Sequence, residues 1–168
     1  RWGEMAVFYR TNAQSRVLEE CLLRSGVPYK VIGGTRFYDR KEIKDAVAYL
    51  KAVSNPADEV SVKRVLNLPK RGIGDTTVAK VDAYAQMIGG TFVDGLRRAE
   101  DADVSGKSLK GINAFLSLLD SFADELAKGP GPALEAILRD TGYVDELAEQ
   151  RSVEAEGRLE NLQELVGM

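Results

Sequence analysis

The sequence predicts a mainly α-helical protein, in which a short strand–helix–strand piece precedes an all-helical domain. Residues 1–32 contain two short apolar runs rich in β-branched and aromatic side chains, which are typical of strands, with one helix-length segment between them. From residue 33 onward, apolar residues recur three and four positions apart, as they do in amphipathic helices. The fold class therefore combines a small α/β piece with a larger helical region.

Residues 5–9 (Met-Ala-Val-Phe-Tyr) are expected to form a buried strand. Thr11 and Gln14 then match a helix start, because Thr caps the first turn and Gln three positions later returns a hydrogen bond. One face of this helix is expected to be buried, so that the thiol on it would be an inert core group. That face carries Val17, Leu18, Cys21 and Leu22.

This first helix is expected to end just before Gly26, a residue that adopts the left-handed conformation at many helix ends. Pro28 cannot continue a helix, and residues 29–32 (Tyr-Lys-Val-Ile) are expected to form a second strand. At Gly33 and Gly34 the pattern changes to a helical one.

The remaining helices are predicted from apolar spacing and from residues that begin or end helices. Asp39 and Glu42 form a variant of the capping box, Asp58 and Thr91 are suitable N-caps, and Gly89 permits a left-handed stop. The expected helices occupy residues 39–54, 58–66, 75–88, 91–98, 109–126, 133–149 and 155–166, with a polar linker over residues 100–108.

The composition excludes several kinds of active site. Histidine is absent from the sequence, and one cysteine cannot build a multi-cysteine zinc site. Neither a phosphate-loop motif nor a dinucleotide-binding glycine motif occurs. This chain alone is therefore not expected to be an enzyme or to hold a metal. With no apolar run near the ~18 residues of a membrane span, no membrane partner is expected, and a lone cysteine suits a reducing cytoplasm.

Charge is distributed unevenly along the chain, whose net charge is −3. Residues 1–80 hold 15 Lys and Arg against 9 Asp and Glu, whereas residues 81–168 hold 8 against 17. A basic first part can attract a polyanion. On charge alone, the favoured alternative is that each part has an ordinary solvated surface.

Residues 66–77 (Leu-Asn-Leu-Pro-Lys-Arg-Gly-Ile-Gly-Asp-Thr-Thr) are a candidate phosphate-binding turn between two helices. Glycine lets the backbone approach an anion closely, and a helix N-terminus offers unpaired N–H groups and a positive dipole end. This is the arrangement of a helix-hairpin-helix module, whose backbone contacts position DNA without reading its sequence. The groups that would contact phosphate are those of Lys70, Arg71, Gly72, Gly74, Thr76 and Thr77.

An alternative stays open for this segment. In a plain turn between helices, the glycines would serve conformation only, and Lys70 and Arg71 would lie in solvent. Asp75 would repel a phosphate unless its side chain caps the helix and points aside.

Five segments of the chain match one family in combination. They are residues 6–20 (Ala-Val-Phe-Tyr-Arg-Thr-Asn-Ala-Gln-Ser-Arg-Val-Leu-Glu-Glu), 27–29 (Val-Pro-Tyr), 33–46 (Gly-Gly-Thr-Arg-Phe-Tyr-Asp-Arg-Lys-Glu-Ile-Lys-Asp-Ala), 69–74 (Pro-Lys-Arg-Gly-Ile-Gly) and 158–165 (Arg-Leu-Glu-Asn-Leu-Gln-Glu-Leu). Together they resemble the PcrA/UvrD/Rep family of superfamily-one DNA helicases.

The resemblance implies two parts of unequal size. Residues 1–32 would be the end of the first segment of the RecA-like motor domain 2A. Residues 33–168 would be most of the inserted, helical 2B subdomain, incomplete at its C-terminus. A hinge for 2B would fall at Gly33 and Gly34, although a glycine pair at a strand end is equally suited to an ordinary turn.

The resemblance also implies DNA contacts. Arg10 and Asn12 would touch single-stranded DNA; the alternatives are an ion pair for Arg10 and a helix cap for Asn12. The 2B contact with duplex DNA would map onto Arg71, Gly72, Ile73, Gly74, Thr76 and Thr77. Three further basic residues could face DNA, but they are expected at the surface or in contacts between domains: Arg36, Arg40 and Lys41.

The parent protein would be an ATP-dependent 3′-to-5′ DNA helicase of repair or replication in the bacterial cytoplasm, associated with the nucleoid. ATP and Mg²⁺ would bind parts of the parent that this chain lacks, so no cofactor is expected here. The implied partners are duplex DNA or a fork junction, single-stranded DNA through the 2A piece, and the rest of the motor.

A different function remains as the alternative. The chain could be a regulatory module for self-association or for binding repair proteins, without DNA binding of its own. The acidic second part and an apolar surface along residues 109–126 would support it.

Overall fold

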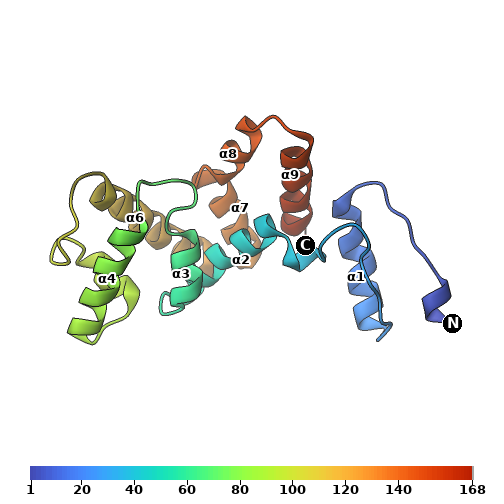
Figure 1. Ribbon diagram of the computed structural model, residues 1–168, viewed down its shortest axis with the longest axis horizontal. Helices are drawn as coiled ribbons and strands as arrows, with labels where there is room; N and C mark the ends of the chain where they lie inside the picture. The colour runs from blue at the N-terminus through green and yellow to red at the C-terminus, as the bar shows by residue number, and fades with distance from the viewer. Residues whose placement is uncertain (168) are drawn as a thin grey trace. The chain divides into compact units, whose positions relative to one another are not determined.

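Helices joined by turns and loops build the computed structural model, which describes residues 1–167 (Figure 1). None of the helices in this described range is long and apolar enough to cross a membrane. Three short 3₁₀ turns are η1 (Trp2–Glu4), η2 (Asn12–Gln14) and η3 (Phe37–Asp39). The α-helices are α1 (Ser15–Arg24), α2 (Lys41–Ser54), α3 (Glu59–Val65), α4 (Asp75–Ile88), α5 (Phe92–Arg97), α6 (Gly106–Ala127), α7 (Pro130–Asp140), α8 (Tyr143–Glu149) and α9 (Val153–Val166).

The chain divides into two compact units. We call Asp45–Glu146 the central unit, and Arg1–Lys44 with Leu147–Met168 the terminal unit. Each unit is described separately below.

A hydrophobic core fills the central unit, because the apolar stripes of its helices face one another. The expected inner face of the long helix α6 is confirmed, since its apolar side chains are buried at helical spacing. The largest fully buried side chains of this unit are Tyr49, Phe92, Phe115, Phe122, Leu66, Leu96, Ile112, Ile137 and Val62.

Several predicted helix ends are confirmed in the central unit. The Asp58 carboxylate accepts a hydrogen bond from the Ser61 backbone N–H (3.1 Å), and Thr91 Oγ1 accepts one from the Asp94 N–H (3.2 Å). Gly89 ends α4 in the left-handed conformation, with φ +66°.

Two predicted boundaries are wrong. The helix expected over residues 133–149 is two helices, α7 and α8, because Gly142 adopts φ +77° between them and a left-handed residue interrupts helical hydrogen bonding. The polar linker expected over residues 100–108 is shorter, since α6 begins at Gly106. The last residues of the expected polar linker thus form the first turn of α6 instead.

The strand–helix–strand piece is not present, which corrects the predicted fold class. Residues 5–9 and 29–32 flank the predicted helix α1 but form no strand, and residues 1–167 contain no sheet. A strand is stabilised by backbone hydrogen bonds to a neighbouring strand, and these segments have none within that range. Phe8, expected in a buried strand, is 92% exposed, and Ile32 of the second expected strand is 80% exposed.

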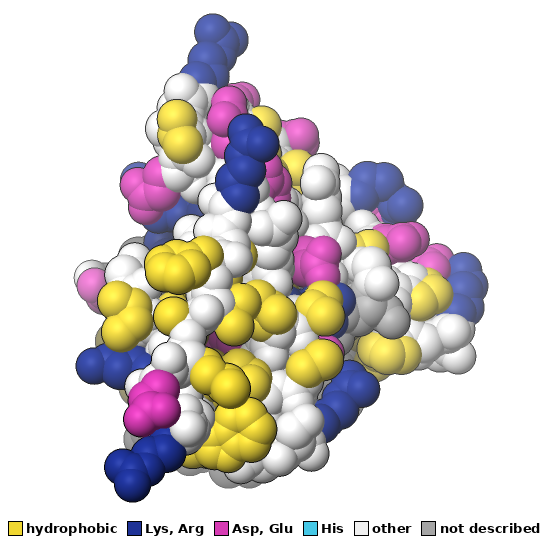
Figure 2. Space-filling model, turned by 90° about the vertical axis from the view of Figure 1, so that its right-hand side faces the viewer, with side chains coloured by type: hydrophobic (Ala, Val, Ile, Leu, Met, Phe, Trp, Pro, Cys, Tyr) yellow, Lys and Arg dark blue, Asp and Glu magenta, His cyan; other side chains and the backbone are white. Residues whose placement is uncertain are grey.

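The apolar face of α1 differs from its prediction in the same way. Val17 is half exposed, and Cys21 is exposed where an inert buried thiol was expected. Figure 2 shows hydrophobic side chains gathered on one face of the molecule. The exposed large apolar residues of the terminal unit are Trp2, Met5, Val7, Phe8, Val17, Leu23, Ile32, Tyr38 and Val153.

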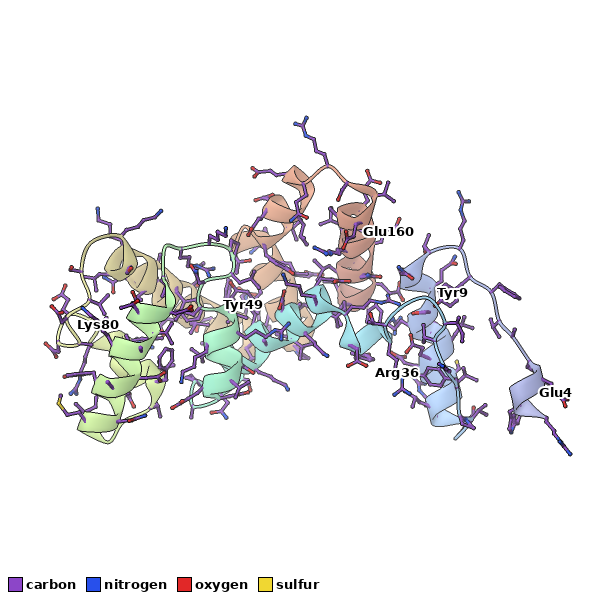
Figure 3. The ribbon with its side chains drawn as sticks, viewed as in Figure 1. Glu4, Tyr9, Arg36, Tyr49, Lys80 and Glu160 are labelled. Atoms are coloured by element: carbon purple, nitrogen blue, oxygen red, sulfur yellow. The ribbon has the colours of Figure 1, made fainter. Side chains whose placement is uncertain are left out.

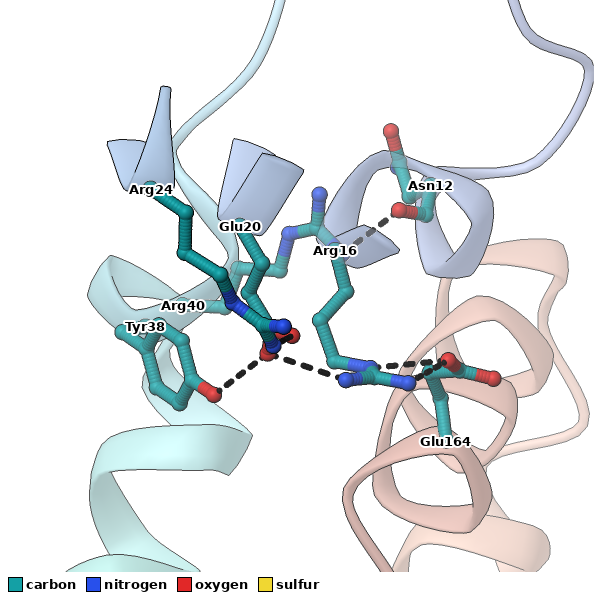
Figure 4. Close-up of polar contacts among 7 residues, drawn as sticks. All are labelled: Asn12, Arg16, Glu20, Arg24, Tyr38, Arg40 and Glu164. Atoms are coloured by element: carbon teal, nitrogen blue, oxygen red, sulfur yellow. Dashed lines mark hydrogen bonds and ion pairs between the residues drawn. The ribbon is translucent and has the colours of Figure 1, made fainter. Parts of the chain in front are cut away.

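Polar contacts hold much of the terminal unit together (Figure 4). Arg16 forms ion pairs with Glu20 (2.9 Å) on its own helix and with Glu164 (2.7 Å) on α9. Hydrogen bonds from Arg16 and from the Tyr38 hydroxyl lower the pKa of the Glu20 carboxyl. The start of α1 is thereby tied to α9.

Arg40 is the centre of a second polar cluster in this unit. It is only 7% exposed, so of the two expected positions, at the surface or in a contact between domains, the surface position is wrong. Its guanidinium donates hydrogen bonds to Asn161 Oδ1 (2.8 Å), Ser15 Oγ (2.7 Å) and the Asn12 carbonyl (2.8 Å). Burial lowers the pKa of Arg40, and the carboxylates of Glu19 and Glu42 act in the opposite direction.

Candidate nucleic-acid interface

Residues 66–74 form the turn that joins α3 to α4, and two features set its shape (Figure 1). The Asn67 side-chain oxygen accepts hydrogen bonds from the backbone N–H groups of Arg71 (2.7 Å) and Ile73 (3.3 Å). Gly72 has φ +77°, a left-handed conformation that favours glycine. Ile73 is buried in the core. The backbone of the turn is therefore held by the Asn67 side chain and by the burial of Ile73.

Arg71 points into the turn. Its Nη1 donates hydrogen bonds to the carbonyl oxygens of four residues, at distances between 2.9 and 3.3 Å. These carbonyls lie at the end of α3 and just beyond it, where backbone acceptors lack helical partners and a cation is favourable. The four residues are Val65, Leu66, Leu68 and Pro69.

Aromatic side chains complete the environment of Arg71. Its Nη2 donates a hydrogen bond to the Tyr49 hydroxyl (2.8 Å), and its guanidinium carbon lies 5.5 Å from the centre of the Phe115 ring. The Tyr49 hydroxyl in turn donates to the Leu68 carbonyl, and Figure 3 places Tyr49 inside the central unit near the turn. Burial raises the pKa of Tyr49, an effect that the adjacent Arg71 opposes. In this conformation Arg71 supports the turn from within.

Other residues of the turn face solvent. Lys70 is exposed, and no ion pair or hydrogen bond of its side chain occurs among residues 1–167. Gly74 is the N-cap of α4 and is exposed, and its carbonyl accepts from the N–H groups of Thr77 (3.0 Å) and Val78 (3.1 Å). Thr76 is exposed and Thr77 is half-buried. The N–H groups of Asp75 and Thr76, which precede those of Thr77 and Val78, have no helical acceptor at the start of α4, and the exposed ammonium group of Lys70 belongs to the same turn.

Asp75 is the first residue of α4 and is exposed. No side-chain hydrogen bond caps this helix end within the described part of the chain, so the capping position considered for Asp75 is not adopted. A carboxylate at a helix N-terminus is favoured by the helix dipole. It also opposes a phosphate at the same place.

The start of α6 lies against this turn, a contact that was not predicted from the sequence. Ser108 Oγ donates a hydrogen bond to the Gly72 carbonyl (2.8 Å), although the two residues are 36 positions apart. A side chain at Gly111 would overlap the Arg71 carbonyl oxygen, so only glycine allows this approach. Gly111 lies on the apolar face of the predicted helix, and a glycine at such a position often marks a close contact with another backbone. It could have indicated this contact from the sequence.

The candidate single-strand contacts lie in the terminal unit. The backbone N–H groups of Arg10 and Thr11 donate to Gln14 Oε1 (3.0 and 3.4 Å), and Thr11 is the N-cap of η2. Asn12 is therefore not the cap residue. The side chains of Arg10 and Asn12 are exposed, and Arg10 has no ion pair in residues 1–167. Their DNA contact remains a prediction.

Gly33 and Gly34 are exposed, and Gly33 adopts φ +80°. Both belong to the terminal unit, and their hinge role also remains a prediction. Within the described range, no three His, Cys, Asp or Glu side chains are grouped so as to hold a metal ion.

Comparison with known proteins identifies the family. The sequence model of the UvrD-like helicase C-terminal domain matches residues 1–168. The chain is 46% identical over 170 residues to the ATP-dependent DNA helicase UvrD1 of Mycobacterium tuberculosis. It is 41% identical over 167 residues to the ATP-dependent DNA helicase PcrA of Bacillus subtilis, and 38% identical over 169 residues to PcrA of Staphylococcus aureus.

These alignments cover nearly all of this chain but a small part of each relative. They include 99% of the chain for UvrD1 and for the Bacillus PcrA, and 100% for the Staphylococcus PcrA. The corresponding shares of the relatives are 22%, 23% and 23%. The chain thus spans less than a quarter of the length of these helicases.

Proposed function

Because the chain belongs to the family of UvrD-like helicase C-terminal domains, we propose that it is the DNA-contacting 2B portion, preceded by the end of a 2A motor segment, of an ATP-dependent 3′-to-5′ DNA helicase. The turn at residues 66–77 binds the backbone of duplex DNA without reading its sequence. ATP and Mg²⁺ would bind other parts of the longer protein. That protein acts in repair or replication at the bacterial nucleoid.

One observation carries this proposal: an unpaired ammonium group, on Lys70, lies in the same short turn as the solvent-facing start of α4. A phosphate there would meet backbone N–H groups, the positive end of the helix dipole and a cation. Such contacts involve no base edges, so affinity would depend on salt and little on sequence.

Arg71 has a different part in this proposal. Its guanidinium contacts four carbonyls and Tyr49, so it positions the glycine backbone for the phosphate. Lys70 supplies the charge that reaches solvent. The two neighbouring basic residues therefore act in different ways.

The test measures the affinity of the purified protein for a blunt duplex over a range of salt concentrations, with and without Lys70→Gln. We expect the slope of log affinity against log salt to become shallower by about 0.9, the loss of one phosphate contact. Lys128→Gln is the matched control, because Lys128 is an exposed lysine at the other end of α6 that pairs with Glu125 (2.8 Å). An unchanged slope for Lys70→Gln would contradict the proposal.

The second candidate function is self-association or binding of repair proteins without DNA binding. The apolar face of α6 does not support it, because that face is buried in the central core. The exposed apolar residues of the terminal unit do, with Phe8 at 92% and Trp2 at 63% exposure. Sedimentation velocity over a range of protein concentrations tests it. A concentration-dependent dimer with no duplex binding at low salt would favour this function over the first.

A further inference from the structure

We propose that Tyr49, on α2, is a positioning residue for the candidate turn: its hydroxyl fixes Arg71 and the backbone on both sides of Lys70, although Tyr49 itself does not reach DNA. This inference rests on the proposed function of the turn. It extends the candidate site to a core residue outside residues 66–77 that was not predicted from the sequence as a site residue.

Tyr49 is held inside the central unit (Figure 3). Its side chain is 1% exposed and belongs to the hydrophobic core of that unit. Its neighbours on α2, Ala48 and Ala52, are buried in the same core. A side chain in this position cannot touch a phosphate. Any effect of Tyr49 on DNA binding must therefore pass through the residues that its hydroxyl contacts.

The hydroxyl of Tyr49 has two partners in the turn. It donates a hydrogen bond to the Leu68 carbonyl and accepts one from Arg71 Nη2 (2.8 Å). A phenol hydroxyl can donate its hydrogen and accept another bond at the same time, so the two contacts are compatible. Leu68 and Arg71 stand on either side of Pro69 and Lys70. The hydroxyl therefore holds both ends of the short segment that carries the exposed ammonium group.

The contact with Tyr49 also sets the orientation of the Arg71 guanidinium. The two hydrogens of Nη1 are shared among four carbonyl oxygens, all of them within 3.3 Å. Nη2 is different, because it donates to the Tyr49 hydroxyl. A planar guanidinium that is bound through both nitrogens is fixed against rotation. Without the hydroxyl, the Nη1 contacts alone would leave the plane free to turn.

This arrangement affects binding through order and not through charge. A turn whose shape is already fixed in the free protein loses less conformational entropy when it binds a phosphate. Removal of the Tyr49 hydroxyl would leave the charges of Lys70 and Arg71 in place. Tyr49 thus differs from Lys70, whose removal would change the number of phosphate contacts and with it the salt dependence.

The experiment compares Tyr49→Phe with the unmodified protein of residues 1–168. Affinity for a blunt duplex of mixed sequence is measured between about 50 and 200 mM salt. We expect affinity to fall by about three- to ten-fold, the range that corresponds to the net value of one hydrogen bond. We expect the slope of log affinity against log salt to stay unchanged, because no cation is removed. A steeper slope would overturn the inference, since Arg71 would then have been released to bind a phosphate itself.

Tyr143→Phe is the matched control. Tyr143 is a second buried tyrosine of the central unit, 5% exposed, and its hydroxyl donates a hydrogen bond to Asp45 Oδ2 (3.0 Å). This variant loses the same chemical group from the same core but leaves the contacts of the turn in place, so its duplex affinity should be unchanged. Thermal unfolding of both variants shows that each is folded at the temperature of the binding measurement. Equal losses of affinity for the two variants would overturn the inference, because lower stability alone would then explain them.

A double-mutant cycle tests whether Tyr49 acts through Arg71. Arg71→Lys keeps the positive charge but removes the second nitrogen that binds the Tyr49 hydroxyl. Tyr49→Phe, introduced into the Arg71→Lys protein, should lower affinity by less than about two-fold, because the bond between the two side chains is already absent. Equal losses in the two backgrounds would contradict a positioning role.

Lys70→Gln separates this inference from the proposed function. An unchanged affinity for Tyr49→Phe together with a shallower salt slope for Lys70→Gln would overturn the inference and leave the proposed function standing. Unchanged affinity and slope for both variants would overturn both.

Discussion

The central and terminal units are both helical, but they are stabilised differently. In the central unit, apolar stripes from α2 to α7 meet in one core. In the terminal unit, much of the apolar surface is exposed, and ion pairs and hydrogen bonds of Arg16 and Arg40 connect the segments. An apolar stripe therefore predicts a buried face only where another element covers it.

The largest expected effect is a difference in the free energy of unfolding between two phenylalanine-to-alanine variants. Phe115→Ala should destabilise the central unit by about 3–5 kcal/mol, because its ring is fully buried and its removal leaves a cavity. Phe8→Ala should change stability by no more than about 0.5 kcal/mol, since Phe8 is 92% exposed. Urea unfolding measures both. Similar losses for the two variants would contradict the contrast between the units.

Arg40→Ala tests the polar cluster of the terminal unit. We expect a loss of about 1.5–3 kcal/mol, because hydrogen bonds from a charged donor are removed and the buried Asn161 side chain loses a partner. Hydrogen exchange of the α9 amides measures the effect in this unit. The control is Arg36→Ala, at an exposed arginine of the same unit, which should leave α9 exchange unchanged.

A pair of glycines tests the close approach of α6 to the turn. Gly111→Ala should cost about 1–3 kcal/mol, because the new methyl group would overlap the Arg71 carbonyl oxygen. Gly157→Ala, inside α9 with no atom near its added methyl group, should instead stabilise the protein by up to about 1 kcal/mol. Thermal unfolding distinguishes the two signs. A neutral Gly111→Ala would mean that the turn and α6 are not in contact.

The smallest expected effect concerns charge at the start of α4. Asp75→Asn removes a carboxylate from the solvent-facing helix end where the proposed phosphate binds. Duplex affinity at low salt should rise by about two- to five-fold, the range of a single charge at a helix terminus. Fluorescence anisotropy with a labelled duplex measures it. A fall in affinity would place the phosphate elsewhere on the protein.

Local patterns were sufficient for most of the central unit. The caps at Asp58 and Thr91, the left-handed stop at Gly89 and the buried face of α6 all depend on residues within one or two helical turns. The candidate turn was also visible as a motif. Local features of this kind can be predicted from the order of neighbouring residues along the chain.

Other features depend on residues that are distant in sequence. Residues 5–9 have the composition of a strand, but pairing requires a neighbouring strand that residues 1–167 do not provide. Arg71 and Lys70 are adjacent and equally charged, yet one binds backbone carbonyls and the other faces solvent. Nothing in the motif itself distinguishes them.

The sequence by itself determined the helical character, most helix ends and the position of the glycine turn, because these follow from local propensity and spacing. Only the tertiary structure decided that Arg71 supports the turn from inside, that Lys107 lies over Gly72 and that Arg40 is buried. The physical reason is that burial and pairing depend on which surfaces meet, and the partners of these three side chains include residues from 22 to 121 positions away along the chain.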